Sequence, residues 1–254
     1  MKLIIAATDF SKASRNAVYY AAEMAKRSKA RMVLFHSFMP PVMMSEVPVI
    51  MPTLAELEKE ATKVMKRMAA TIRTKLGPAL KLEIVCKYGL AVDAINDYAE
   101  AQQADLIVMG MKGAGLVEEK LAGSITTDVI RKSKRPVLSV GQSVKFSRIK
   151  NIVFATDYLE IKSQTVFDTV KEIATLFKSH IHLLNVVPDS ATVPNVSQAA
   201  QGIKTEHVFE GLKHSFHAIV NKSVTDGINE FIKLNNIDLV VMIPRKHNFF
   251  ETLI

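Results

Sequence analysis

The sequence predicts an α/β protein made of two consecutive copies of one parallel-sheet domain. Short apolar runs alternate with amphipathic helical patterns over residues 1–142, and this alternation is typical of a parallel sheet covered by helices. The apolar runs of the first copy return later in the chain in the same order, which indicates a duplication. With 254 residues, of which 48% are hydrophobic, the chain can form two ordinary domains with cores of their own.

Five apolar runs predict the strands of the first copy. They lie near residues 2–7, 31–36, 82–87, 105–109 and 136–140. Two amphipathic patterns predict helices: one begins after the capping residue Ser11, and the other covers 54–76 and ends at Gly77-Pro78. The segment 38–53 is apolar but broken by prolines, so it fits neither a strand nor a helix.

The second copy repeats three of these stretches. Residues 2–10 return at 150–158, 32–36 at 181–185, and 105–109 at 238–242. We therefore expect one domain over residues 1–143 and a second over 148–254. Because the sequence stops at Ile254, before the counterpart of Gly123, we expect the second domain to lack its last helix and fifth strand, either through truncation or as an incomplete partner.

The composition narrows the classes of protein to consider. The formal net charge is +8, and most of the basic excess lies in the first half, which suits anionic ligands. Aromatic residues are not interleaved with this charge, so a solvated surface is favoured over nucleic-acid binding. No apolar run is long enough to span a membrane, and Asp9 interrupts the apolar N-terminal run, so we expect a cytoplasmic protein. The single cysteine, Cys86, is interpreted as a buried structural thiol.

A glycine-rich motif lies between the fourth apolar run and a helical pattern. The motif reads Gly110-Met111-Lys112-Gly113, then nine residues, then Gly123-Ser124-Ile125-Thr126. Glycines let the backbone approach an anion, while N–H groups at a helix start and the hydroxyls of Ser124 and Thr126 can donate to phosphate. Its spacing differs from both the P-loop and the dinucleotide-binding fingerprint. Two interpretations stay open: a phosphate site, or turn glycines followed by a helix that Ser124 caps.

The pair Thr8-Asp9 follows the first apolar run. In an open parallel sheet, ligands bind outside the carboxyl ends of the strands, where the winding direction reverses. If the first and fourth strands are neighbours there, Thr8-Asp9 and the glycine motif face one crevice. Asp9 then accepts hydrogen bonds from adenine or ribose, or helps to hold a divalent metal among phosphate oxygens. The other interpretation is that Asp9 only makes a turn or caps the following helix.

These stretches resemble the ATP-binding branch of the universal stress protein family. The resemblance is carried by the glycine motif together with Thr8-Asp9-Phe10-Ser11, Leu34-Phe35-His36-Ser37 and Lys134-Arg135-Pro136-Val137-Leu138. It implies doubly wound, Rossmann-like sheets of the adenine nucleotide alpha hydrolase type, with strand order 3-2-1-4-5, that bind ATP with Mg²⁺, and it places Asp9 at the metal. The residues that it places at the nucleotide are Ala7, Thr8, Asp9, Ser37, Met109, Gly110, Met111, Lys112, Gly113, Gly123, Ser124, Ile125 and Thr126.

The second copy departs from this pattern at the glycines. Ile243 stands where the first copy has Gly110, and Pro244 removes an N–H donor, so phosphate binding of this kind is not expected there. Asp157 remains as the counterpart of Asp9. We therefore expect one nucleotide per chain, with the second copy as a degenerate structural or regulatory partner. Because members of the family are commonly dimeric, the resemblance implies that the two copies pair as a fused dimer, and a homodimer of chains is a further possibility.

The resemblance implies a nucleotide-dependent stress-response or regulatory protein whose ATP hydrolysis is slow or absent. The residues themselves offer no catalytic base for efficient hydrolysis. One rival interpretation is a weak ATPase or a nucleotide-dependent transferase, in which Asp9 positions a metal and Lys112 stabilises the transferred phosphate. The other is a protein or nucleic-acid docking module without a nucleotide.

Two further features have interpretations of their own. His214 and His217 have the spacing of a metal-binding pair on a helix, but His217 aligns with the third strand of the second copy, which argues against a metal there. The segment 38–53 either folds over the nucleotide or the sister domain, or is a loop with no such role. The residues that it would bury are Val47, Val49, Ile50 and Met51.

Overall fold

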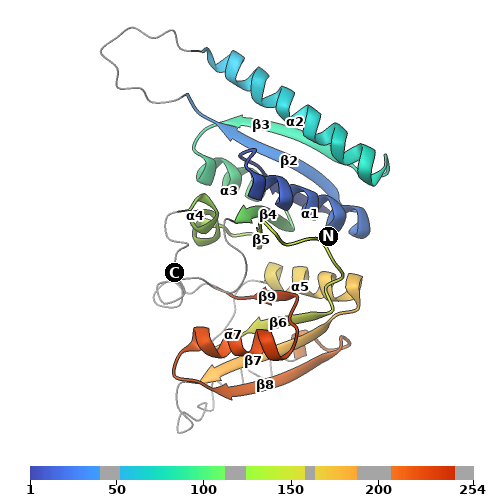
Figure 1. The fold of residues 1–254 in the computed structure, drawn as a ribbon, viewed down its shortest axis with the longest axis vertical. Coiled ribbons are helices and arrows are strands. Elements are labelled where there is room, and N and C mark those ends of the chain that lie inside the picture. The colour runs from blue at the N-terminus through green and yellow to red at the C-terminus, as the bar shows by residue number, and fades with distance from the viewer. Residues whose placement is uncertain (41–51, 112–123, 158–163, 188–206, 244–254) are drawn as a thin grey trace, which may run out of the picture. The chain divides into compact units, whose positions relative to one another are not determined.

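The computed structural model of this chain describes residues 1–40, 52–111, 124–157, 164–187 and 207–243. The described residues divide between Phe146 and Ser147 into two compact units. Each unit has one parallel sheet with helices packed on it (Figure 1). None of the described helices is both long enough and apolar enough to cross a membrane.

The first unit has a five-stranded parallel sheet in the order β3-β2-β1-β4-β5. Its strands are β1 (Leu3–Ala7), β2 (Arg31–Phe38), β3 (Leu82–Tyr88), β4 (Leu106–Met111) and β5 (Val137–Gly141). All five lie where the sequence predicts them, within one or two residues at each end. The predicted fold class and strand order are therefore confirmed for this unit.

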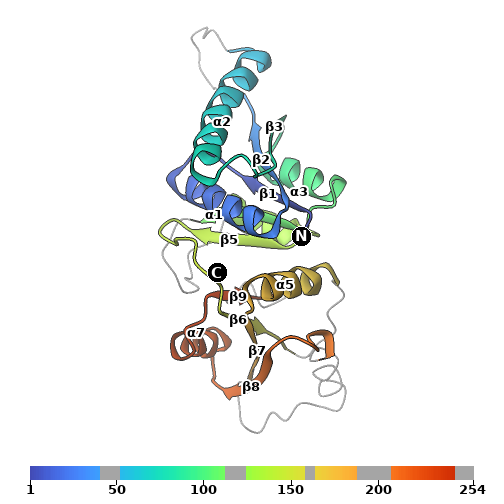
Figure 2. The same ribbon diagram turned by 90° about the vertical axis from the view of Figure 1, so that its right-hand side faces the viewer.

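Four helices cover the two faces of this sheet. They are α1 (Lys12–Ser28), α2 (Leu54–Leu76), α3 (Ala91–Ala101) and α4 (Ile125–Lys132). Figure 2 shows α1 and α2 on one side of the sheet and α3 on the other. On the α3 side, Ile95 of α3 and Val129 of α4 join a core cluster with strand residues such as Phe35. The first two helices thus cover one face and the next two cover the other, as in a doubly wound sheet.

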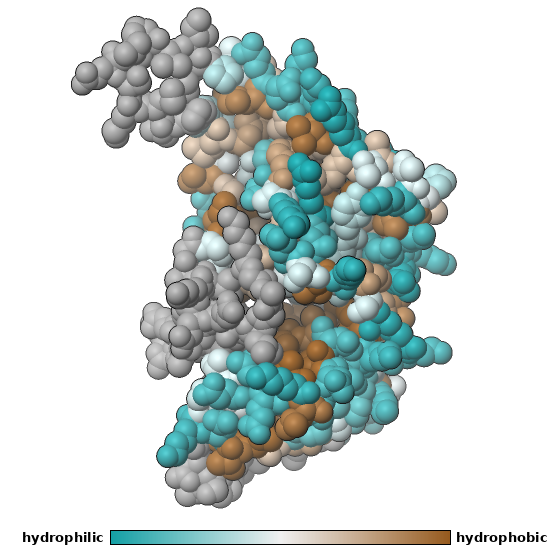
Figure 3. Space-filling model, viewed as in Figure 1, coloured by the Kyte–Doolittle hydropathy of each residue, from teal (hydrophilic) through white to brown (hydrophobic). Residues whose placement is uncertain are grey.

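Local signals explain where the two long helices begin and end. The Ser11 hydroxyl accepts a hydrogen bond from the Ser14 N–H at 3.2 Å and caps α1, as predicted. In α2, Thr53 and Glu56 form a capping box, and Gly77 follows the last turn with a φ of +89°. The buried residues of α2 follow a helical period, whereas its outer side is hydrophilic (Figure 3).

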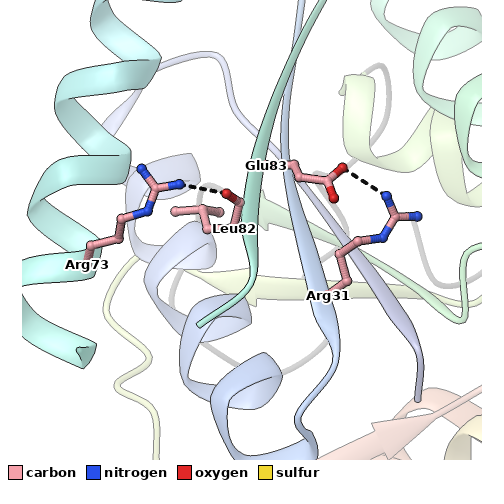
Figure 4. Close-up of polar contacts among 4 residues, drawn as sticks. All are labelled: Arg31, Arg73, Leu82 and Glu83. Carbon is pink, nitrogen blue, oxygen red and sulfur yellow. Dashed lines mark hydrogen bonds and ion pairs between the residues drawn. The ribbon is translucent and has the colours of Figure 1, made fainter. Parts of the chain in front are cut away.

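Two arginines stabilise the outer edge of the first sheet (Figure 4). The Arg73 guanidinium on α2 donates to the carbonyl oxygen of Leu82 on β3 at 2.7 Å. Arg31 on β2 pairs with Glu83 on β3 at 2.8 Å. Because β3 is the edge strand, the contact of Arg73 occupies a carbonyl group that would otherwise be open to pairing with another chain.

The second unit has a four-stranded parallel sheet in the order β8-β7-β6-β9. Its described elements are β6 (Asn151–Ala155), α5 (Gln164–Phe177), β7 (His180–Val187), β8 (His214–Val220), α7 (Val224–Leu234) and β9 (Leu239–Val241). This order corresponds to strands 3-2-1-4 of the first unit. The second sheet is therefore a smaller version of the first.

The two units repeat an acidic contact as well as a strand order. The Asp105 carboxylate accepts hydrogen bonds from the backbone N–H groups of Lys2 and Leu3, at the start of β1. In the second unit, the Asp238 carboxylate accepts from Lys150 and Asn151, at the start of β6. Equivalent residues thus make equivalent contacts, which supports the duplication inferred from the sequence.

Candidate functional site

The candidate site of the first unit lies where β1 and β4 end side by side. β1 pairs with β2 on one side and with β4 on the other, so the strand order reverses between β1 and β4. The chain leaves β1 into the Thr8–Ser11 turn and α1, and it leaves β4 at Met111. This is the switch point at which open parallel sheets bind ligands.

Hydrogen bonds among small polar groups hold the turn after β1. The Asp9 carboxylate accepts from the Ser11 N–H at 3.0 Å, and the Thr8 hydroxyl lies 3.0 Å from the Ser14 hydroxyl. Phe10, between them, has a φ of +64°. Asp9 therefore does make the turn that one interpretation of the sequence predicted, and Ser11 rather than Asp9 caps α1.

The Asp9 side chain stays exposed while it makes this turn. Burial by itself raises the pKa of this carboxyl, but hydrogen bonds from Ser11 and Ser14 outweigh burial and hold the pKa below its usual value. Asp9 is therefore ionised at neutral pH. An ionised, accessible carboxylate at this position can accept from hydroxyl groups or ligate a cation.

His36 is a site residue that the sequence did not single out. Its Nδ1 lies 2.7 Å from the Thr8 carbonyl oxygen and must donate, because a carbonyl only accepts. Its ring packs on Phe10, with the ring centroids 4.4 Å apart. In the second unit the Asn185 amide makes the equivalent bond to the Thr156 carbonyl at 2.8 Å. The signal that could have found His36 is its place at the end of the strand beside β1.

The structure gives a reason for glycine at position 110 that the sequence did not suggest. A Cβ atom added to Gly110 would lie 2.5 Å from the Ala13 carbonyl carbon and 2.5 Å from the Ser14 nitrogen. The missing side chain therefore lets the first turn of α1 pack directly on the end of β4. Met109, one residue earlier, is buried, and Met111 is partly buried.

The start of α4 lies against the end of β4. The Ser124 hydroxyl caps α4 by accepting from the Thr127 N–H at 3.2 Å. The Thr126 hydroxyl donates to the Gly110 carbonyl oxygen at 2.9 Å. Ile125 is 49% exposed. The hydroxyls of Ser124 and Thr126 are thus both engaged within the protein.

The structure brings only part of the predicted nucleotide site together. Ala7 and Ser37 lie at or near the carboxyl ends of the neighbouring strands β1 and β2. Three residues of the glycine motif lie outside the described residues, as do the four residues that segment 38–53 was predicted to bury. These are Lys112, Gly113 and Gly123, and Val47, Val49, Ile50 and Met51.

The described residues contain no group of three potential metal ligands. His214 and His217 both lie on β8, and His217 contacts His182 of β7, with the Nδ1 of His182 and the Nε2 of His217 3.1 Å apart. Asp9 is a single carboxylate, which fits Mg²⁺, because Mg²⁺ is usually held by one or two carboxylates together with substrate phosphates. Cys86 on β3 is partly buried; burial, and then the charge of Glu58, raise the pKa of its thiol, so it has little thiolate character.

Comparison with known proteins identifies a family for the first unit. The model of the Universal stress protein family matches residues 1–141. A curated universal stress protein from Methanocaldococcus jannaschii is 32% identical over 149 residues, which cover 57% of this chain and 84% of that relative. Two other curated universal stress proteins match over shorter stretches, and the chain spans about half of their length, 53% and 50%.

Solved structures extend the likeness of fold over both units. A universal stress protein from Archaeoglobus fulgidus is 17% identical, with a TM-score of 0.70, and the match covers 94% of this chain and 85% of that one. A shorter universal stress protein, crystallised in complex with cAMP, is 27% identical with a TM-score of 0.43 and covers 56% of this chain. The first of these matches shows that the likeness of fold extends over most of this chain.

Proposed function

The chain belongs to the universal stress protein family, and we propose that its first unit binds an adenine nucleotide, ATP with Mg²⁺, at the carboxyl edge of its sheet. One observation carries the proposal. The ionised carboxylate of Asp9 and the capped start of α4 follow neighbouring strands, β1 and β4, at the switch point of the sheet. A nucleotide suits both parts of the site, because its ribose hydroxyls can donate to Asp9 and its anionic phosphates can accept at the start of α4.

The chemistry of each group suits a part of the nucleotide. The start of α4 offers N–H groups and the positive end of the helix dipole to phosphate oxygens. Asp9 accepts from the ribose hydroxyls or ligates Mg²⁺, which would neutralise phosphate charge when bound. The backbone at Ala7 and Ser37 borders the base. Lys112, Gly113 and Gly123 complete the phosphate contacts in this proposal.

We assign this binding a regulatory rather than a catalytic role, because the Asp9 carboxylate accepts from the Ser11 N–H and, in this proposal, also holds the ribose or Mg²⁺. The second unit has Ile243 in place of Gly110, so it takes part as a partner of the first without a nucleotide of its own. Pairing of the two units, assembly of two chains and a cytoplasmic location belong to the same proposal.

Conservative substitution of Asp9 tests the proposal. Asp9→Asn keeps an oxygen that can accept from the Ser11 N–H, so the turn is preserved, but it removes the charge. We expect Asp9→Asn to weaken ATP–Mg²⁺ binding about 10- to 100-fold, because hydrogen bonds to charged groups contribute roughly 1.5–3 kcal/mol. Isothermal titration calorimetry on the full chain measures the change.

The second unit provides a matched control for this experiment. Asp157→Asn makes the same change at the repeated position, and we expect it to leave the ATP affinity within about twofold of the unmodified protein. A chain that shows no heat with ATP, and no thermal stabilisation by ATP, would refute the proposal. Equal losses of ATP affinity in the two variants would show that the nucleotide does not depend on Asp9 in particular.

A further inference from the structure

Thr126 and Gly110 join the two ends of the glycine motif. Gly110 is in β4, before the stretch 112–123, and Thr126 is in the first turn of α4, after it. The Thr126 hydroxyl donates to the Gly110 carbonyl oxygen at 2.9 Å, and the Thr126 side chain is only 7% exposed. This bond therefore ties the start of α4 to the end of β4.

The direction of this hydrogen bond decides what Thr126 can do. A carbonyl oxygen has no proton to give, so the hydroxyl proton of Thr126 is committed to Gly110. The same proton is not available to donate to a phosphate oxygen. The sequence suggested that the Thr126 hydroxyl donates to the ligand. In the structure it donates to Gly110 instead.

Gly110 is itself held in place from two other sides. Its Cα packs on the backbone of Ala13 and Ser14 in α1, and it pairs with Val140 of β5 in the sheet. The bond from Thr126 thus ties the start of α4 to a point that neither α1 nor the sheet allows to shift. Because α1 begins with the Ser11 cap, the turn that holds Asp9 is anchored to the same point.

We propose that Thr126 is a positioning residue that ties the start of α4 to the end of β4, so that the start of α4 and residue 110 already hold their bound arrangement when a phosphate arrives. This inference rests on the proposed nucleotide function. Groups that are already held in place lose less conformational freedom on binding, and the affinity gained in this way depends on the phosphates and not on the base.

Two substitutions at Thr126 and two ligands test the inference. Thr126→Val keeps the shape and removes the donor, whereas Thr126→Ser keeps a hydroxyl. We expect Thr126→Val to weaken ATP–Mg²⁺ binding about 5- to 30-fold and adenosine binding less than twofold, and we expect Thr126→Ser to recover most of the ATP affinity. Isothermal titration calorimetry gives both affinities. In nucleotide-free protein, the amide hydrogens of α4 are expected to exchange faster in Thr126→Val.

The second unit again supplies a control. Thr169 in α5 is buried and donates to the Thr165 carbonyl oxygen at 2.9 Å, so Thr169→Val removes a similar bond in the unit that lacks the motif. We expect it to leave both affinities unchanged. If Thr126→Val binds ATP as tightly as the unmodified chain, or if its α4 exchanges no faster without nucleotide, Thr126 does not position the start of α4 although ATP binding stands. If the unmodified chain binds no ATP, the proposed function itself fails.

Discussion

Replacing Gly110 with alanine is expected to destabilise the first unit by about 3 kcal/mol or more. The added Cβ atom would lie 2.5 Å from two backbone atoms of α1, the Ala13 carbonyl carbon and the Ser14 nitrogen. Overpacking in a core usually costs about 1–3 kcal/mol, because side chains can turn aside. Backbone atoms cannot turn aside, so α1 must move away from β4. Denaturant unfolding followed by circular dichroism, with hydrogen exchange to distinguish the units, measures the loss.

Gly227 in α7 is the matched control for Gly110. A Cβ atom there would lie 2.7 Å from the Cγ1 atom of Val186, which is a side-chain methyl group that can give way. We therefore expect Gly227→Ala to change the free energy of unfolding by less than Gly110→Ala does. If Gly110→Ala unfolds within about 0.5 kcal/mol of the unmodified chain, the packing explanation of this glycine is wrong.

The result also separates two reasons for a glycine at position 110. If the position serves only the approach of a phosphate, Gly110→Ala folds normally and loses ATP affinity. If it serves the packing of α1 on β4, stability falls whether or not a nucleotide is present. Stability must therefore be measured first, because an unfolded unit also fails to bind ATP.

The second unit is expected to lose stability as the pH falls from about 6.5 to 4. His182 is 7% exposed, its Nδ1 lies 3.1 Å from the Nε2 of His217, and the His180 ring centroid is 4.1 Å from its own. Burial first, and then the charges of His180, His217 and Lys213, lower the pKa of His182 to about 4. Ser215 on β8 and the Phe231 ring on α7 contact the pair.

The sign of the effect follows from the pKa difference. In the unfolded chain the pKa of His182 is near the ordinary histidine value of 6.5, so below that pH the unfolded chain binds a proton that the folded unit excludes. Stability is complete above pH 6.5 and is lost as the pH falls toward the folded pKa of about 4. The loss from His182 alone is about 3 kcal/mol at pH 4. Lowered pKa values of His180 and His217, each caused chiefly by burial, act in the same direction.

Hydrogen exchange monitored by mass spectrometry at pH 7.5 and pH 4.5 can follow each unit separately, once intrinsic exchange rates are corrected for pH. The expected result is that protection of β7 and β8 falls at acidic pH while protection of β1 and β4 persists. In His182→Phe, which retains a ring beside Phe231, most of this pH dependence should disappear. His207→Gln removes an exposed histidine from the same unit and should retain it. Acid sensitivity confined to the first unit would contradict this account.

Much of the fold follows from signals that are local in the sequence. The bounds of α2 were predictable because its apolar residues keep a helical period and Gly77 ends it. The Ser11 cap and the strands of the first unit were predictable for the same reason, because caps and apolar runs act over a few residues. The site was less predictable. The sequence placed Asp9 near β4, but it did not decide whether Asp9 accepts from Ser11 or meets a ligand.

By itself, the sequence determined the fold class, the duplication and the edge of the first sheet at which Asp9 meets the glycine motif. Only the tertiary structure decided that Gly110 lies against the backbone of α1 and that Thr126 donates to Gly110. It also decided that His36 bonds to the turn after β1 and that His182 contacts His217 on β8. The physical reason is the range of the interaction. A cap or a period acts between residues a few positions apart, whereas each of these contacts joins residues that come together only when strands pair and helices pack on them.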